Sequence, residues 1–213
     1  MYFNSQTDYW NSVAQNKEFT TNLNYGLIAP FIKQESHIID YGCGYGRTLN
    51  EFHEKGFKNL TGFDYAPEMI SSGKKRFPFL NLKVCQDNKM DINSDSVDLV
   101  LLFAVLTCII DNGQQKELID EILRVLKPGG LIYLNDFLLN DDERNRSRYE
   151  SGFKKYVTYG VFELPEGALL RHHDLFRIKE LTKDFRPEVN EKVLFKTMNG
   201  HTSNGIIFIG RKI

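Results

Sequence analysis

Three glycines at alternate positions, Gly42, Gly44 and Gly46, lie where a short apolar stretch ends and a helical pattern begins, in "IIDYGCGYGR". Glycine lets the backbone turn tightly and come close to a ligand, and the helix that follows offers free N–H groups and a positive dipole end. The dinucleotide pattern GxGxxG would need a glycine at position 47, but the residue there is Arg47. The loop therefore predicts a nucleotide-like ligand and argues against a nicotinamide dinucleotide.

A carboxylate in the next strand narrows the ligand further. Asp64 ends the stretch "NLTGFD", 22 positions beyond Gly42, where a carboxylate can accept hydrogen bonds from two ribose hydroxyls. An aspartate at a strand end is also common as a turn or helix cap, so Asp64 alone is weak evidence. Together with the glycine loop it indicates a ligand that contains adenosine.

The segments that must position these residues alternate between strand and helix patterns. Strands are predicted at 37–41, 59–64, 81–86, 96–106 and 131–137, and helices at 47–56, 67–77 and 114–127, the last stopped by Pro128-Gly129-Gly130. Two helices are expected before this series, after the cap-like stretch 5–8 and at 22–32, and a helix at 175–185 with an antiparallel hairpin at 191–213 after it. This order implies a doubly wound, mainly parallel α/β sheet with right-handed crossovers.

Four stretches in sequence order carry a family resemblance: "IIDYGCGYGR", "TGFDYAPEMI", "CQDNKMDINSDSVDLVLLFAVL" and "LKPGGLIYLNDF". Together they resemble the successive motifs of the class I S-adenosylmethionine-dependent methyltransferases, in particular the small-molecule type, over residues 37–137. The resemblance implies a Rossmann-like, doubly wound, seven-stranded and mostly parallel sheet with an antiparallel C-terminal strand. It also implies S-adenosyl-L-methionine as the cofactor and methyl transfer by in-line displacement. Two positions depart from the pattern, because Leu106-Thr107-Cys108 lacks a histidine common there and Gln86 replaces a usual glycine.

The resemblance also implies roles for single residues. Asp40 and the backbone of the glycine loop would hold the methionine part of the cofactor, Asp64 its ribose, and the segment that starts at Phe103 would border the sulfonium. In similar enzymes the N-terminal helix often covers the cofactor, although Tyr2, Phe3, Tyr9 and Trp10 can equally be ordinary packing. The implied cofactor-binding set is Trp10, Asp40, Gly42, Cys43, Gly44, Asp64, Tyr65, Met69, Asp87, Asn88 and Phe103, with Tyr65 and Met69 beside the adenine and Asp87 and Asn88 at its edge.

Residues 138–174 interrupt the alternating pattern. We expect one methyltransferase domain over 1–213, with an N-terminal helical cap at 1–33 and an insertion or lid at 138–174. Aromatic residues recur in the insertion at helical spacing, so one face can cover the site while "DDERNR" faces water. The alternative is that this face is ordinary core. The substrate-binding candidates are Tyr149, Tyr156 and Arg171.

No catalytic residue is assigned. A base is needed only if the acceptor must lose a proton, and the candidates by position are Asp136, His172 and His173. Each also has an ordinary structural interpretation, as a strand-end cap for Asp136 and as a partly packed turn for the two histidines.

Composition and charge limit the partners and the compartment. The net charge of −1 disfavours a polyanionic partner such as nucleic acid. The three cysteines form no CxxC pair and have no histidine at zinc-ligand spacing, so we expect reduced thiols and no metal. The start "MYFNSQTDYW" lacks a signal-peptide pattern and no apolar run is long enough to span a bilayer, so we expect a soluble, cytoplasmic protein that does not enter membranes.

The leading hypothesis is an S-adenosylmethionine-dependent methyltransferase with a small-molecule acceptor. The (D/N/S)-P-P-(Y/F/W) run of amino-methylating nucleic-acid enzymes is absent, since Ala104-Val105-Leu106-Thr107 stands in its place. The alternatives are a protein or tRNA methyltransferase, a non-catalytic S-adenosylmethionine-binding module and, disfavoured by Arg47, an NAD-dependent oxidoreductase. The sequence predicts neither the acceptor nor the oligomeric state.

Overall fold

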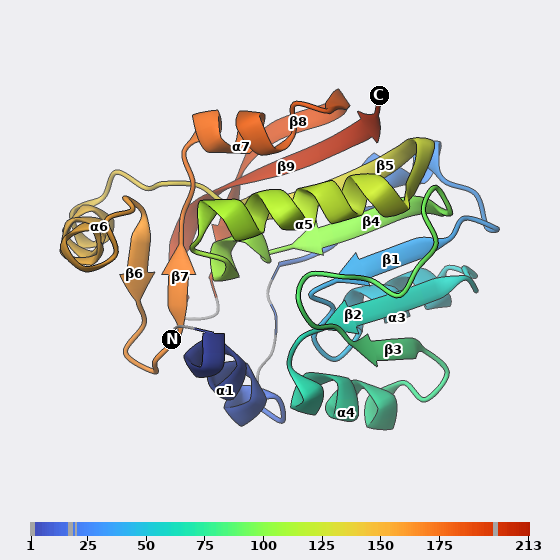
Figure 1. Ribbon diagram of the computed structural model, residues 1–213, viewed down its shortest axis with the longest axis horizontal. Coiled ribbons are helices and arrows are strands. Elements are labelled where there is room, and N and C mark those ends of the chain that lie inside the picture. Colours follow the sequence, from blue (N-terminus) through green and yellow to red (C-terminus); the bar gives the residue numbers. More distant parts are fainter. Residues whose placement is uncertain (1–2, 17–18, 20, 198–199) are drawn as a thin grey trace.

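A single mixed sheet forms the centre of the molecule. The computed structural model describes residues 3–16, 19, 21–197 and 200–213, and side chains from Gln6 onward. Within these residues a seven-stranded sheet has the order β3-β2-β1-β4-β5-β9-β8 (Figure 1). Its strands are β1 (Ile38–Tyr41), β2 (Leu60–Asp64), β3 (Asn81–Val84), β4 (Val97–Phe103), β5 (Leu126–Phe137), β8 (Phe185–Lys196) and β9 (Thr202–Lys212).

Strand pairing confirms the predicted fold class. Parallel pairing joins β1 to β2 and β4, β2 to β3, and β4 to β5. The strand β9 is antiparallel to both of its neighbours, β5 and β8. The sheet is thus mostly parallel with an antiparallel C-terminal strand, as the sequence implied.

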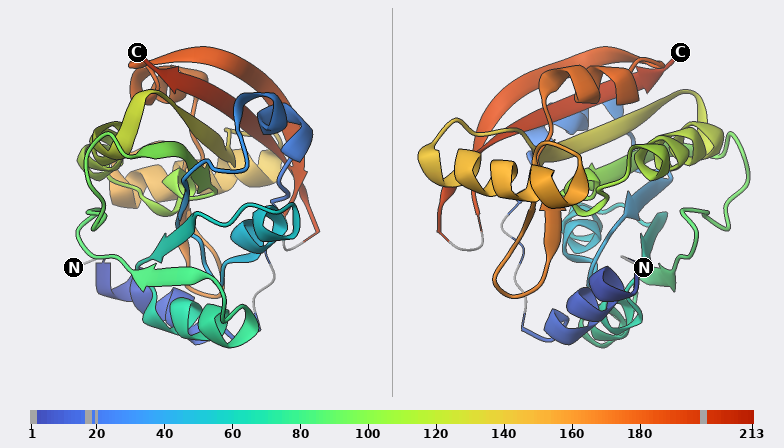
Figure 2. Two further views of the ribbon diagram at one scale, coloured as in Figure 1. Left: turned by 90° about the vertical axis from the view of Figure 1, so that its right-hand side faces the viewer. Right: turned by 60° about the vertical axis from the view of Figure 1, so that its left-hand side comes forward.

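Helices cover both faces of the sheet (Figure 2). Alternate residues of β4 enter different cores: Val100 and Leu102 pack with α5 (Asn112–Val125) and α7 (Leu175–Leu181), whereas Leu99 and Leu101 pack with α3 (Arg47–Glu54). A strand buried on both faces has a nearly continuous apolar sequence, which is the pattern that β4 shows. The remaining sheet helix, α4 (Pro67–Arg76), starts with its proline in the first turn.

Several predicted boundaries were wrong, among them that of the helix at 175–185, which ends as α7 at Leu181, with β8 starting at Phe185. The helix α5 ends at Val125, and the chain enters β5 at Leu126 before Pro128 is reached, because a residue that precedes proline favours extended backbone. The strand β4 ends at Phe103, since Ala104 has φ of +54° and the short 3₁₀ helix η2 (Leu106–Cys108) follows. The predicted helix at 22–32 is only the turn α2 (Tyr25–Ile28) and the 3₁₀ turn η1 (Ala29–Phe31).

The N-terminal segment and the insertion lie together beyond the carboxyl ends of the parallel strands (Figure 1). The helix α1 (Phe3–Val13) includes the stretch 5–8 that was expected to cap it, so that expectation was wrong. The insertion contains α6 (Glu143–Tyr156) and the antiparallel pair β6 (Val161–Glu163) and β7 (Leu169–Arg171). No helix in the described ranges combines the length and apolar character that a membrane crossing requires.

The helix α6 rests on β6 through a glycine. A Cβ atom added to Gly152 would lie 1.8 Å from the carbonyl oxygen of Val161, which belongs to the backbone and cannot rotate away. The close approach of the helix to the strand therefore depends on the missing side chain at this position.

We expect Gly152→Ala to destabilise the protein by about 1–3 kcal/mol, the usual cost of overpacking, although alanine normally favours a helix over glycine. Gly26→Ala is the matched control, because its added Cβ would meet only the Asn24 side chain at 3.5 Å. Thermal or urea unfolding measures both. A Gly152→Ala protein as stable as the wild type would show that α6 does not pack this closely in solution.

Candidate functional site

One large cavity, of about 1110 Å³, opens at the carboxyl ends of β1, β2 and β4. The glycine loop, the end of β2, the segment after β4, α1 and the insertion all contribute to its lining. Carboxyl ends of parallel strands form the usual binding edge of an open α/β sheet. The described part of the chain contains no cluster of three or more histidines, cysteines and carboxylates that could hold a metal ion.

The glycine loop is shaped by positive φ angles and close contacts. Gly42 has φ of +74° and Gly44 of +54°. A Cβ on Gly42 would lie 2.4 Å from Val105 Cγ2, and one on Gly44 would lie 2.7 Å from a ring carbon of Phe19. Any side chain at either position would therefore be strained and would clash, which explains two of the three glycines.

Asp64 connects the loop to the next helix. Its Oδ2 accepts a hydrogen bond from the N–H of Gly44 and its Oδ1 one from the N–H of Ala66, each at 2.8 Å. The side chain lines the cavity although the residue is only 8% exposed. Burial raises the pKa of Asp64 to about 6, against the opposing effect of the backbone N–H groups. Each carboxylate oxygen keeps a lone pair that a hydroxyl of a ligand can reach.

A second buried carboxylate and a guanidinium lie beside the loop. Asp40 lines the cavity, and burial raises its pKa to about 8 while nearby Arg47 lowers it and Asp64 raises it. Arg47 pairs with Glu51 at 2.6 Å and donates to the carbonyl of Thr21, but its buried Nε has no partner in the described structure. This corner can therefore accept a molecule that carries both an ammonium and a carboxylate group.

The remaining predicted cofactor residues gather around the same space. Asn88 accepts a hydrogen bond from Tyr41 Oη at 3.0 Å, and both Asp87 and Asn88 have φ of +55°. Of the predicted cofactor residues, only Gly44 is absent from the lining of the cavity, and its N–H donates to Asp64 instead. The predicted residues in the lining are Trp10, Asp40, Gly42, Cys43, Asp64, Tyr65, Met69, Asp87, Asn88 and Phe103.

The helix α1 bridges the two sides of the cavity. Asn11 accepts a hydrogen bond from the N–H of Glu68 at the start of α4, and Gln6 donates to the carbonyl of Leu169 in β7. Trp10 lies between these contacts and lines the cavity. Tyr9 is buried but outside the lining, Tyr2 lies outside the described residues, and no side chain is described for Phe3.

Two of the proposed bases do not face the cavity. His173 is buried and its Nε2 lies 2.8 Å from the side-chain amide of Gln115, while burial lowers its pKa to about 3. Asp136 accepts hydrogen bonds from the N–H groups of Thr107 and Phe137, and burial raises its pKa to about 7. Neither belongs to the lining, so their positions support a structural role.

Two of the three substrate-binding candidates are also absent from the lining. Arg171 donates to the carbonyl of Ile110 and to Asn112 Oδ1, which fastens β7 to the start of α5. Tyr149 is fully buried with its Oη 2.6 Å from His172 Nδ1. Each side chain is used inside the fold, which supports a structural role for both residues.

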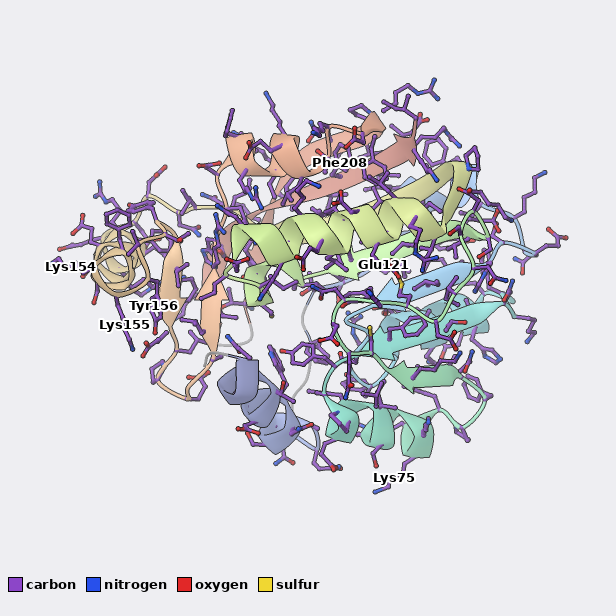
Figure 3. The ribbon with its side chains drawn as sticks, in the orientation of Figure 1. Lys75, Glu121, Lys154, Lys155, Tyr156 and Phe208 are labelled. Atoms are coloured by element: carbon purple, nitrogen blue, oxygen red, sulfur yellow. The ribbon has the colours of Figure 1, made fainter. Side chains whose placement is uncertain are left out.

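His172 and Tyr156 do line the cavity. The His172 ring stacks on Phe137 with centroids 5.4 Å apart, and burial together with Arg148 lowers its pKa well below the usual value. It is therefore a neutral imidazole at pH 7. Tyr156 ends α6 beside β6, where its hydroxyl bonds to Glu163 (Figure 3).

Two arginines in the lining were missed by the sequence analysis, which expected "DDERNR" (141–146), with Arg144, to face water and made no prediction for Arg148. Arg144 and Arg148 both line the cavity, whereas Asp141, Asp142 and Glu143 are exposed as expected. Positions 144 and 148 are four apart and so share a helix face. Tyr156 lies two further steps of four residues along the same face. This shared face was the signal in the sequence that could have placed both arginines near Tyr156 in the cavity lining.

All three cysteines are free thiols, and all three line the cavity. Burial raises the pKa of Cys43, Cys85 and Cys108, so each is protonated at neutral pH.

Comparison with known proteins is consistent with this site. A family model described as a methyltransferase domain matches residues 38–130. A SAM-dependent methyltransferase from Methanosarcina mazei superposes with a TM-score of 0.83 at 25% identity, covering 89% of this chain and 98% of that one. These matches, with the glycine loop and Asp64 in place, identify residues 38–130 as a domain of the class I S-adenosylmethionine-dependent methyltransferase superfamily. This domain is that of an enzyme, with S-adenosylmethionine as cofactor, which sets the nicotinamide alternative aside.

Two further relatives differ in the acceptors that their names give. The 1,6-didemethyltoxoflavin-N1-methyltransferase of Burkholderia thailandensis, solved with 1,6-didemethyltoxoflavin and S-adenosylhomocysteine, shares the fold with a TM-score of 0.73 at 15% identity, over 99% of this chain and 88% of that one. The tRNA N(3)-cytidine methyltransferase of Mus musculus is 29% identical over 112 residues, which are 47% of this chain and 28% of that protein. The chain spans less than half the length of the curated relatives that it matches.

We expect Asp64→Ala to weaken binding of S-adenosylhomocysteine by about 1–3 kcal/mol, the usual effect of leaving buried polar groups unpaired. Titration calorimetry measures the affinity, and circular dichroism checks the fold because Asp64 also holds two backbone N–H groups. Asp91→Ala, at an exposed carboxylate outside the cavity, is the control. An unchanged affinity in Asp64→Ala would mean that the ribose contact is misassigned.

The pKa of Asp40 predicts a pH dependence of stability. Because the folded pKa of about 8 exceeds the ordinary 3.8, the stabilising contribution of the protonated group is complete below pH 3.8 and is lost as pH rises through 8. Asparagine does not titrate, so Asp40→Asn should gain Tm relative to the wild type from pH 4 to 8 and then level off. Thermal melts without cofactor test this, and a pH-independent difference between the two proteins would contradict it.

Proposed function

We propose that this chain transfers the methyl group of S-adenosylmethionine to a small-molecule acceptor. The observation that carries the proposal is the closure of the cavity by α1 and the insertion, which meet through Gln6 and the carbonyl of Leu169. Aromatic rings of Phe137, Tyr156 and Phe162 line the part of the cavity next to the insertion. A deep space with aromatic walls, partly covered by α1 and the insertion, suits a small flat molecule better than a folded protein or an RNA stem.

The chain's own residues fit the cofactor at each end. In this proposal Asp40 and the unpartnered Arg47 Nε hold the amino and carboxylate groups of the methionine part, and Asp64 holds the ribose hydroxyls. Tyr65 and Met69 flank the adenine. When bound, the cofactor supplies a methyl group already activated by the positive sulfonium.

The rest of the catalytic task is positioning. Holding the acceptor atom in line with the methyl group in a space shielded from water can contribute on the order of 7–11 kcal/mol to the rate. Asp136 and His173 are used within the fold, and no residue is proposed as a general base. An acceptor that reacts without first losing a proton to the protein fits this arrangement.

The relative that binds 1,6-didemethyltoxoflavin supports a small flat acceptor by analogy of fold. The net charge of −1 also disfavours a tRNA acceptor, which would need clustered basic residues.

Methyl-labelled S-adenosylmethionine tests the proposal when it is incubated with the purified protein and three fractions of an extract: small metabolites, proteins and RNA. We expect label only in the small-metabolite fraction, with S-adenosylhomocysteine bound in calorimetry and NAD not bound. Label in protein or RNA would contradict the acceptor class. Cofactor binding without transfer to any fraction would instead support a non-catalytic module.

A further inference from the structure

The guanidinium of Arg148 is half-buried in the cavity lining without a carboxylate partner among the described residues. No carboxylate lies within ion-pair distance, and its Nε is buried and makes no hydrogen bond. Its Cζ lies 3.5 Å from the ring centroid of Phe162 and 5.6 Å from that of Tyr149. Burial lowers the pKa of Arg148, but a guanidinium remains cationic at neutral pH.

This stacked arrangement favours an anion. A guanidinium that lies over a ring face gains cation–π energy there, while its N–H groups point outward within its own plane. Those N–H groups match the two oxygens of a carboxylate or the oxygens of a phosphate. Arg148 is a partly desolvated cation with no carboxylate within ion-pair distance, so an anionic group of a ligand would stabilise it.

His172 presents a second donor to the same space. The amide of Asn140 has a defined orientation, because its Oδ1 accepts from the N–H of Asn204 at 2.7 Å while its Nδ2 donates to the carbonyl of Leu138 and to Ser203 Oγ. The same Nδ2 lies 3.3 Å from His172 Nδ1. Both N–H bonds of the Nδ2 group are already used in those two hydrogen bonds, so this contact does not determine the tautomer of His172.

The Tyr149 hydroxyl indicates the tautomer of His172. Its oxygen accepts from the N–H of Asn140 at 3.4 Å, and its nearest acceptor is His172 Nδ1 at 2.6 Å, against 3.4 Å to Asn145 Oδ1. Donation to Nδ1 then places the ring proton on Nε2. Nε2 has no hydrogen-bond partner in the described part of the chain, and His172 lines the cavity. In this tautomer His172 offers an N–H donor to a ligand and cannot take a proton from it through Nε2.

The two donors are neighbours across one aromatic ring. Phe162 packs against the guanidinium of Arg148 on one side and, edge to face with centroids 4.9 Å apart, against His172 on the other. Arg144 lines the same region one helical turn before Arg148. Its distance to Asp142 is 4.0 Å, so it adds further positive charge with only a weak internal partner.

We propose that Arg148 and the Nε2–H of His172 bind the anionic group, a carboxylate or a phosphate, of a small planar acceptor that lies against Phe162 and Phe137. This inference rests on the proposed function, since it describes the acceptor of that same site. The substrate class is thus an organic acid or phosphate ester with a flat body.

The test uses the protein saturated with S-adenosylhomocysteine and three probes of matched shape: benzoate, phenyl phosphate and the neutral benzamide. Titration calorimetry should show roughly tenfold or tighter binding of at least one anion over benzamide, as expected for charge-assisted hydrogen bonds. Preference for benzoate identifies a carboxylate acceptor and preference for phenyl phosphate a phosphate ester. Equal affinity for all three probes, or binding of none, overturns the inference.

Variants separate this subsite from the cofactor site. Arg148→Met should abolish the preference for the anion and leave S-adenosylhomocysteine affinity unchanged, Arg148→Lys should retain part of the preference, and His172→Phe should reduce it. Arg146→Met is the matched control, because Arg146 is exposed on the same helix and outside the cavity lining. A parallel loss of S-adenosylhomocysteine affinity in Arg148→Met would assign the guanidinium to the cofactor and overturn the inference.

Two readouts keep this inference distinct from the proposed function. Long-range nitrogen–proton NMR of the imidazole should show His172 as the Nε2–H tautomer, and an Nδ1–H tautomer would remove the second donor. If wild-type protein fails to bind S-adenosylhomocysteine, the proposed function fails. If it binds the cofactor product but shows no preference for an anion, only the inference about the acceptor fails.

Discussion

The contact on which the site depends is the pair of hydrogen bonds from the N–H groups of Gly44 and Ala66 to the carboxylate of Asp64. This contact fixes the glycine loop after β1 against the start of α4 after β2. Since β1 and β2 pair in parallel, their carboxyl ends lie side by side and the carboxylate can reach both backbones. The loop conformation, the left-handed glycines and the cavity edge all follow from this arrangement.

Three ionisable side chains in the cavity lining are buried at a cost in stability. Desolvation raises the pKa of Asp40 and Asp64 and lowers that of Arg148, so each side chain would be more favourable in water or with a partner. Among the described residues, buried polar atoms without a partner also occur outside the lining, as at Asn135 and His173 Nδ1, but only those in the lining, such as Arg47 Nε and Arg148 Nε, can find a partner on a ligand. Unmet buried polar groups that gather in one cavity are typical of a binding site.

The sequence was sufficient where structure is decided locally. The succession of strands and helices along the chain followed from alternating patterns. The residues at the strand-end half of the cavity followed from Gly42, Asp64 and the motifs of the family resemblance, because each strand end carries its own loop. The acceptor half depends on long-range packing instead. Nothing local distinguishes His172, which faces the cavity, from His173, which faces α5, and the aromatic spacing did not reveal that Tyr149 turns inward while Arg148 lines the cavity.

The two halves of the cavity have opposite electrostatic character, and this has a consequence for the proposed reaction. The half formed by the strand ends contains the buried carboxylates Asp40 and Asp64, whereas the insertion supplies Arg144, Arg148 and a donor on His172. In the proposed function a cationic methyl donor occupies the first half and an anionic acceptor the second. Their mutual attraction in a poorly hydrated space favours close approach, and each offsets the desolvation cost of the protein charges around it. Methyl transfer leaves the donor sulfur as a neutral thioether and passes its positive charge to the acceptor. The attraction between the two molecules is therefore weaker after the reaction than before it, which favours release of both products.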